Sequence, residues 1–176
     1  MAKKKEANLL VTFDPTHLES AKKEILELLK EIGEKADILD AGEGIAEIAV
    51  KDARKAVASL EKLAGKNIEK FLHTSHWIPI DTWTKNAVAD IQKELKKYES
   101  MIDEKEAWKM ELKTRKLKER PDELKLILKL TEVIDRKNVD LEKPEKIVKV
   151  EIIGNKAGLA LLKKNELLNI GKLKQK

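Results

Sequence analysis

The chain alternates between short apolar runs and helical patterns over its first 80 residues. The run Asn-Leu-Leu-Val-Thr-Phe at 8–13 is rich in strand-forming residues, and Asp14-Pro15 stops it. Apolar residues then recur at helical spacing until Gly33. The pattern continues in the order β-α-β-β-α-β over the segments 8–13, 16–33, 38–39, 45–50, 52–65 and 69–80.

The second half of the chain predicts further elements of both kinds. They are a helix over 82–99 with Trp83 on its apolar side, a strand over 107–116, a helix over 121–136 and a hairpin over 147–163 with a Gly-Asn turn. The fold class is therefore α+β. We expect a ferredoxin-like (βαββαβ) domain over residues 1–80, an α/β domain over 81–170 and a loose basic tail over 171–176.

Uncharged and charged residues alternate along the predicted strand over 107–116. One face carries Trp108, Met110, Leu112 and Thr114, and the other carries Lys109, Glu111, Lys113 and Arg115. Because successive side chains of a strand point to opposite faces, this pattern predicts a half-buried strand with a charged face toward solvent.

Composition narrows the class of protein. The 176 residues include no Cys, which excludes disulfides, thiolate metal sites and Cys nucleophiles. The chain lacks an apolar run of the ~20 residues that a membrane span needs and has no signal-peptide pattern, so we expect a cytoplasmic protein without a membrane partner. Abundant Lys and Glu with two Gln are typical of a thermophile.

Charge is unevenly distributed. The net charge is +5, yet residues 1–75 carry 13 Lys and Arg against 14 Asp and Glu, whereas residues 76–176 carry 24 against 18. The whole positive excess therefore belongs to the second half, where an anionic partner would bind.

Motifs for catalysis, metals or cofactors are absent from the sequence. His73 and His76 are three apart on a predicted strand, so their rings would face opposite ways and would not share a metal. The Gly-Glu-Gly at 42–44 lacks the Lys and Ser or Thr of a phosphate loop, and no dinucleotide fingerprint is present. We expect no catalytic residue, no metal and no cofactor.

A basic cluster is the candidate binding site. Lysines and arginines could track phosphates as point charges, with Arg adding bidentate contacts. The candidates are Lys109, Lys113, Arg115, Lys116, Lys118 and Arg120, together with Lys85 and Lys149. The alternative interpretation is a solvated strand face in a Lys-rich protein, and the few aromatic residues argue against stacking of single strands.

The second half resembles a THUMP domain, the RNA-binding module of tRNA-modifying enzymes. The resemblance rests on Trp-Ile-Pro-Ile-Asp at 77–81, the strand at 108–115 and Val-Asp-Leu-Glu-Lys-Pro at 139–144, which leads into the apolar strand at 148–153. It implies RNA binding, a preceding ferredoxin-like domain and a basic strand end at Arg115. The other candidate residues come from charge and spacing.

The resemblance further implies a stand-alone THUMP protein. The family usually carries a catalytic domain, for which the residues after the last strand leave no room. We therefore expect a non-enzymatic adaptor that presents tRNA to a separate modification enzyme, an acetyltransferase that makes acetylcytidine. The alternatives are a general RNA-binding accessory protein, or an enzyme whose carboxylates would be Asp81 and Asp140.

Overall fold

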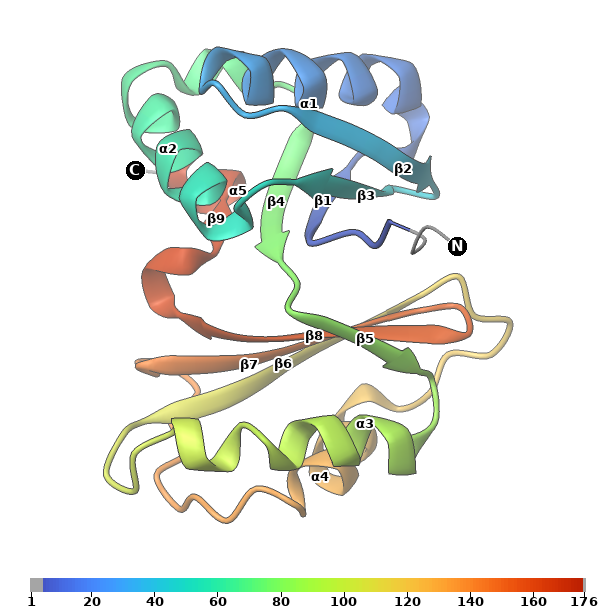
Figure 1. Ribbon diagram of the computed structural model, residues 1–176, viewed down its shortest axis with the longest axis vertical. Helices are drawn as coiled ribbons and strands as arrows, with labels where there is room; N and C mark the ends of the chain where they lie inside the picture. The colour runs from blue at the N-terminus through green and yellow to red at the C-terminus, as the bar shows by residue number, and fades with distance from the viewer. Residues whose placement is uncertain (1–4, 176) are drawn as a thin grey trace. The chain divides into compact units, whose positions relative to one another are not determined.

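The computed structural model describes residues 5–175, an α+β chain with two β-sheets and five α-helices in that range (Figure 1). The chain divides into two compact units. Unit 1 comprises the chain up to Ile80 together with the segment from Asn165, and unit 2 comprises Asp81–Lys164.

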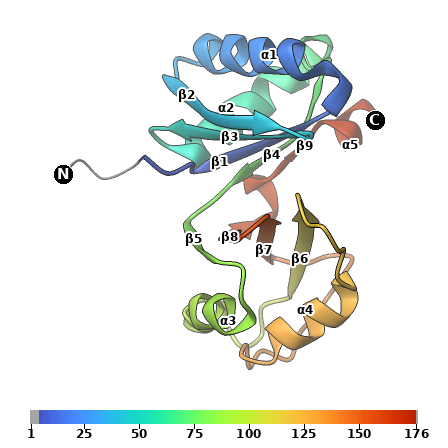
Figure 2. The same ribbon diagram turned by 90° about the vertical axis from the view of Figure 1, so that its right-hand side faces the viewer.

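Unit 1 contains a five-stranded antiparallel sheet with its two long helices on one face. Its elements are β1 (Leu9–Phe13), α1 (Leu18–Glu31), β2 (Ala36–Gly42), β3 (Ile45–Val50), α2 (Ala53–Lys66), β4 (Thr74–Pro79), β9 (Leu168–Asn169) and α5 (Ile170–Lys174). The strand order is β2-β3-β1-β4-β9. Both α1 and α2 pack on the face that carries Leu9, Val11 and Trp77 (Figure 2).

Local capping explains where the helices of unit 1 begin and end. The Asp52 carboxylate accepts a hydrogen bond from the Lys55 amide at 3.1 Å and caps α2. Gly33, at φ +78°, takes the left-handed conformation that ends α1. The buried Glu24 of α1 accepts hydrogen bonds from the amides of Leu72 and Thr74, each at 2.8 Å, which fixes the segment that enters β4.

The predicted order β-α-β-β-α-β is present over β1 to β4. The assignment of this unit to the ferredoxin-like class stays a prediction.

The C-terminal segment differs from the sequence prediction. The chain returns to unit 1 from Asn165, whereas the sequence placed residues up to 170 in the second domain and 171–176 in a loose tail. Within the described residues, Leu168 pairs with Trp77, Ile170 is buried in the core, and Lys174 Nζ donates to the Phe71 carbonyl at 2.7 Å. Lys176 lies outside the described residues. The buried side chains of Leu168 and Ile170 hold this segment against the core of unit 1. The lysines that follow had, by themselves, indicated a solvated tail.

Unit 2 contains a four-stranded sheet with both of its helices on one face. Its elements are β5 (Thr82–Lys85), α3 (Val88–Lys96), β6 (Trp108–Arg115), α4 (Glu123–Thr131), β7 (Lys146–Ile153) and β8 (Lys156–Lys163). The order is β5-β8-β7-β6, with β6 parallel to β7 and the other pairs antiparallel. The predicted alternation along β6 is confirmed: Trp108, Met110, Leu112 and Thr114 are buried, and α3 and α4 cover their face (Figure 2).

The predicted helix over 82–99 is wrong in its first turns. Residues 82–85 form β5, which pairs with β8, and α3 begins at Val88. Asn86 ends the strand, because its amide donates to the Asn155 carbonyl at 3.0 Å and its side chain donates to the Gly154 carbonyl at 3.1 Å. These bonds tie the strand end to the β7–β8 turn. Trp83 consequently lies on the sheet and not on a helix.

We predict that Leu168→Ala lowers the free energy of unfolding of unit 1 by about 3 kcal/mol, because the leucine is buried in its core. Urea unfolding followed by hydrogen exchange of peptides from β1 and β4 measures this change. Lys172→Ala, at an exposed position in the same segment, is the matched control. Equal stability of the two variants would show that the segment does not contribute to the core.

Candidate nucleic-acid interface

Charged side chains of β6 and β7 form a continuous row of ion pairs on the face of the unit 2 sheet opposite the helices. The parallel register sets Glu111 beside Lys149 and Lys113 beside Glu151. Lys109 Nζ lies 2.8 Å from Glu111 Oε1, and Lys149 Nζ lies 3.4 Å from both Glu111 Oε2 and Glu151 Oε1. Arg115 Nε lies 3.4 Å from Glu151 Oε2. We call these five residues the ion-pair ladder.

The ladder uses three of the residues that the sequence proposed for RNA binding. Lys149 is 7% exposed and lies between two carboxylates, so it is the candidate that the geometry disfavours. Lys109 is half-buried and paired with Glu111. Arg115 is bonded through Nε, which is one of the five donors of a guanidinium. Glu151 therefore holds Arg115 in place at the end of the ladder.

The ladder changes the acidity of Glu111. Burial raises the pKa of its carboxyl, but the hydrogen bond from Lys109 and the charges of Lys149 and Lys109 outweigh burial, and the pKa lies below its ordinary value of 4.5. Glu111 is therefore a carboxylate at neutral pH, and it compensates the charge of the buried Lys149.

The remaining candidates are exposed, and four of them follow one another closely. Lys113 lies near the end of β6, and Lys116, Lys118 and Arg120 lie in the segment that leads to α4. Lys116 has φ +57°, so the chain turns out of the strand at this position. The Arg115 carbonyl accepts a hydrogen bond from the Gly154 amide at 2.9 Å, which joins this strand end to the β7–β8 turn.

The strand register extends the basic cluster across the sheet. Arg115 is opposite Ile153, Ile153 is opposite Lys156, and Lys156 is opposite the eighth candidate, Lys85. These four positions form one row from β6 to β5, and the row contains no carboxylate. Adjacent strands are ~4.8 Å apart, so the row spans about 14 Å. We call Lys85, Lys113, Arg115, Lys116 and Lys156, with Trp83 beside them, the cationic end.

The sequence did not identify Lys156 and Trp83 as site residues. Lys156 Nζ lies over the Trp83 ring, 4.6 Å from its centroid, which is a cation–π contact. The predicted hairpin at 147–163 was the signal for Lys156, because a Gly154-Asn155 turn sets Lys156 opposite Ile153. Trp83 was missed because residues 82–85 were read as helix.

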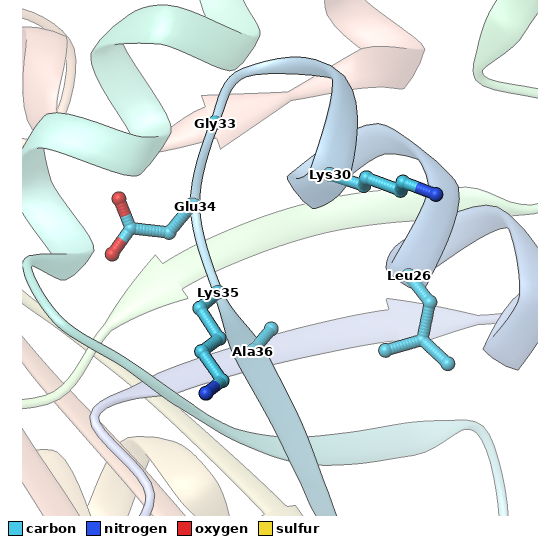
Figure 3. A pocket seen from close by; sticks show the side chains of 6 residues that line it. All are labelled: Leu26, Lys30, Gly33, Glu34, Lys35 and Ala36. Carbon is cyan, nitrogen blue, oxygen red and sulfur yellow. The ribbon is translucent and has the colours of Figure 1, made fainter.

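Other parts of the described chain are weaker candidates for a functional site. A shallow hollow of about 450 Å³ lies beside β2. Figure 3 shows that the charged ends of Lys30, Glu34 and Lys35, which line it, point in different directions. Glu34 accepts a hydrogen bond from the Lys51 amide at 2.8 Å. His73 and His76 have different neighbours, the His17 ring and the Thr12 hydroxyl. Between residues 5 and 175 we find no group of three or more side chains suited to a metal ion.

The described helices are also not membrane spans. None of them combines the length and the apolar character needed to cross a bilayer.

Comparison with known proteins identifies the fold. No protein-family model and no curated protein matches the chain. Its structure is similar to PH1313 from Pyrococcus horikoshii OT3, with a TM-score of 0.60 and 18% identity over 89% of this chain and 54% of that one. It is also similar to TrmN from Thermus thermophilus, with a TM-score of 0.56 and 18% identity over 87% of this chain and 44% of that one.

A possible methylase from Clostridium difficile is a third similar structure. Its TM-score is 0.56, with 11% identity over 89% of this chain and 41% of that one. The chain thus spans about half the length of these solved proteins. The chain therefore shares the fold of these proteins, which agrees with the THUMP-type fold that the sequence resemblance implied.

The prediction that the protein is not an enzyme is wrong. One chain with this fold is described as a possible methylase, and methyltransferases are enzymes. The sequence argument rested on missing local motifs and on the length of the chain. Neither excludes catalysis, because an active site can be assembled from residues far apart in sequence that form no local motif.

We predict that Glu111→Gln destabilises unit 2 at neutral pH and that the effect disappears in acid. The folded pKa of Glu111 is lowered, so its carboxylate stabilises the fold above about pH 4.5, and this stabilisation is lost as the pH falls through the folded pKa. Urea unfolding of both proteins between about pH 7 and about pH 3 measures the difference. Glu104→Gln, at an exposed position, is the control. A gap between Glu111→Gln and the unchanged protein that persists in acid would contradict the ladder's role.

Proposed function

We propose that the protein binds tRNA through the cationic end of unit 2 and presents it to a separate modification enzyme, a tRNA cytidine acetyltransferase. The observation that carries the proposal is the row from Arg115 to Lys85, whose four positions include three cationic residues and no carboxylate. The exposed Lys113, Lys116 and Lys118 extend the same positive surface.

The chemistry of the cationic end suits a phosphate backbone. Ammonium groups contact phosphates as point charges, and Arg adds a planar fork that can bind two oxygens. Contacts of this kind recognise the shape and backbone of folded RNA and not its sequence. The proposal therefore assigns to unit 2 the holding of tRNA.

An adaptor would act by raising effective concentration and fixing orientation. A tRNA held on this chain meets the partner enzyme as part of one complex, so the reaction at its target nucleotide no longer depends on a free encounter. The THUMP-type fold, which occurs in RNA-modification proteins, supports this class of function. Acetylation is proposed from the resemblance carried by residues 77–81 and 139–153. We also infer that unit 1 is ferredoxin-like, from its order β2-β3-β1-β4 and two helices on one face.

A general RNA-binding accessory protein is the second candidate. It would use the same cationic end, so binding to tRNA does not separate the two functions. The dependence of an acetyltransferase on the protein separates them.

We predict that acetylcytidine forms in tRNA at least about tenfold faster when the protein is added to a tRNA acetyltransferase with acetyl-CoA, because co-binding raises the effective concentration of tRNA. Nucleoside analysis of the tRNA measures the product. An acetylation rate that does not respond to the protein would contradict the adaptor function, and so would acetylcytidine formed by the protein without the acetyltransferase.

We predict that Lys113→Glu with Lys118→Glu weakens tRNA binding and makes it less sensitive to salt. Each lost phosphate contact lowers the slope of log affinity against log salt by ~0.7–0.9, so the double variant should lose about 1.5. Both residues are exposed and lie outside the ladder, so folding should be preserved.

The matched control for this experiment is Lys93→Glu with Lys105→Glu. These two lysines are also exposed and belong to unit 2, and their exchange alters the net charge equally. Equal loss of affinity in both double variants would mean that net charge, and not this surface, determines binding.

A further inference from the structure

Strand β6 is an edge of the unit 2 sheet, and the described chain pairs its outer side only at the first residue. In the order β5-β8-β7-β6 its neighbour within the sheet is β7. On the other side a bridge forms at Trp108, whose amide donates to the Asn138 carbonyl and whose carbonyl accepts from the Asp140 amide, each at 3.0 Å. Trp108 therefore turns its backbone groups away from β7.

The residues that follow leave this outer edge open. Every second residue of a strand turns its backbone N–H and C=O to the same side, so Met110, Leu112 and Thr114 present theirs on the side that Trp108 does. Within the part of the chain that the structure describes, no group hydrogen-bonds to them there. Their side chains are buried. The edge thus offers a row of backbone donors and acceptors.

The other sheet edges of the described chain are protected. The register of β2 shifts between Ile38 and Asp40, β5 has four residues and β9 has two. By contrast, β6 pairs in unbroken register over eight residues and contains no Pro. Bulges, short length and Pro are among the means that keep a strand edge from pairing with another chain. Strand β6 is therefore the edge to which a further strand can add.

An exposed apolar stripe lies next to this edge. Leu124 and Leu128 of α4 are 67% and 63% exposed and lie one helical turn apart. Helix α3 lies over β5 and β8, and α4 lies beside α3 over β6, so α4 is the outer helix on the side of β6 (Figure 2). A structure that continues the sheet past β6 would come next to α4, where it could cover the two leucines.

We infer that unit 2 pairs with unit 2 of a second copy of this chain, with the two β6 strands antiparallel. One sheet of eight strands, four from each copy, would then run through both units. A two-fold axis perpendicular to this sheet puts the helices of both copies on the same face, so that α4 meets α4. Packing Leu124 and Leu128 against those of the second copy removes apolar surface from water and drives association. This inference goes beyond the proposed function and does not depend on it.

The charges of β6 select one register for the pair. With Leu112 opposite Leu112 of the second copy, Met110 lies opposite Thr114, and all the open backbone groups are satisfied. Glu111 then lies opposite Lys113 of the second copy, and this contact occurs twice across the two-fold axis. Shifting the strands by two residues would instead set Glu111 opposite Glu111, or Lys113 opposite Lys113. The strand is thus complementary to itself in charge as well as in hydrogen bonding.

The ends of the two strands also fit. The bridge of Val139 occupies the outer edge at Trp108, whereas β6 of the second copy ends at Arg115, opposite Lys109. Lys109 and Arg115 have the same charge, but each pairs with a carboxylate of its own copy, at 2.8 Å and 3.4 Å. The row of the cationic end runs from β6 to β5, away from the paired edge, so the pair leaves that row open to RNA.

Sedimentation equilibrium of the full chain over a concentration series tests for the pair. The mass should rise from the 20.0 kDa of one chain toward twice that value. Amide hydrogen exchange followed by NMR then locates the contact. The amides of Met110, Leu112 and Thr114 should exchange more slowly as the concentration rises. The amides of Glu111 and Lys113, which point toward β7, should be protected at every concentration.

Two pairs of variants test the helix contact. Leu124→Gln with Leu128→Gln should weaken the dimer at least about tenfold, because apolar burial between the two α4 helices is lost. The matched control is Leu39→Gln with Leu72→Gln, which alters two exposed leucines of unit 1 and should leave the dimer unchanged. All four side chains are exposed, so folding should be preserved, and circular dichroism verifies it.

Charge reversal tests the strand register. Lys113→Glu sets a carboxylate opposite Glu111 of the second copy at two places and should weaken the dimer about tenfold. Lys93→Glu, at an exposed position of α3, makes the same change in net charge and should not weaken it.

The outcomes separate this inference from the proposed function. A mass that stays at 20.0 kDa at every concentration would overturn the inference and leave RNA binding, measured by the anisotropy of labelled tRNA, unaffected. A dimer that tolerates both Leu124→Gln with Leu128→Gln and Lys113→Glu would place the contact on another surface and overturn it as well. So would a dimer in which exchange of the outer amides of β6 does not slow.

Discussion

The parallel pairing of β6 with β7 is the constraint on which the candidate interface depends. Its register places Trp108, Met110 and Leu112 under α3 and α4, and it sets Glu111 beside Lys149 on the other face. A shift by one residue would exchange the two faces and bury the charges of β6 in the apolar core. The hydrophobic face therefore determines where every charge of the ladder lies.

The ladder in turn gives the cationic end its character. Lys149 is buried and needs carboxylates, which Glu111 and Glu151 supply, and Glu151 also contacts Arg115. These charges largely cancel one another at distances beyond the ~8–10 Å over which salt screens a field. The row beyond the ladder carries Lys156 and Lys85 and contains no carboxylate, so its positive charge lies where β6 ends and not along the length of the strand.

Those elements of unit 2 that are determined by a local pattern of residues could be predicted from the sequence. Alternation along β6 and the hairpin of β7 and β8 are periodic signals, and both are present. The burial of Lys149 could not be predicted from such a pattern, because it depends on the neighbouring strand β6 and not on the sequence of β7, to which Lys149 belongs. Trp83 was assigned to a helix because the pattern of residues 82–99 continues a real helix that begins at Val88. Four residues are too short a strand to show a period of their own.

A shared fold leaves function open, so the argument for RNA rests on the site. The similar structures are 11–18% identical to this chain, and folds of this kind carry different activities in different proteins. A surface of lysines alone fits any polyanion and predicts binding that weakens uniformly with salt. We therefore propose RNA among the anionic partners from the resemblance carried by residues 77–81 and 139–153.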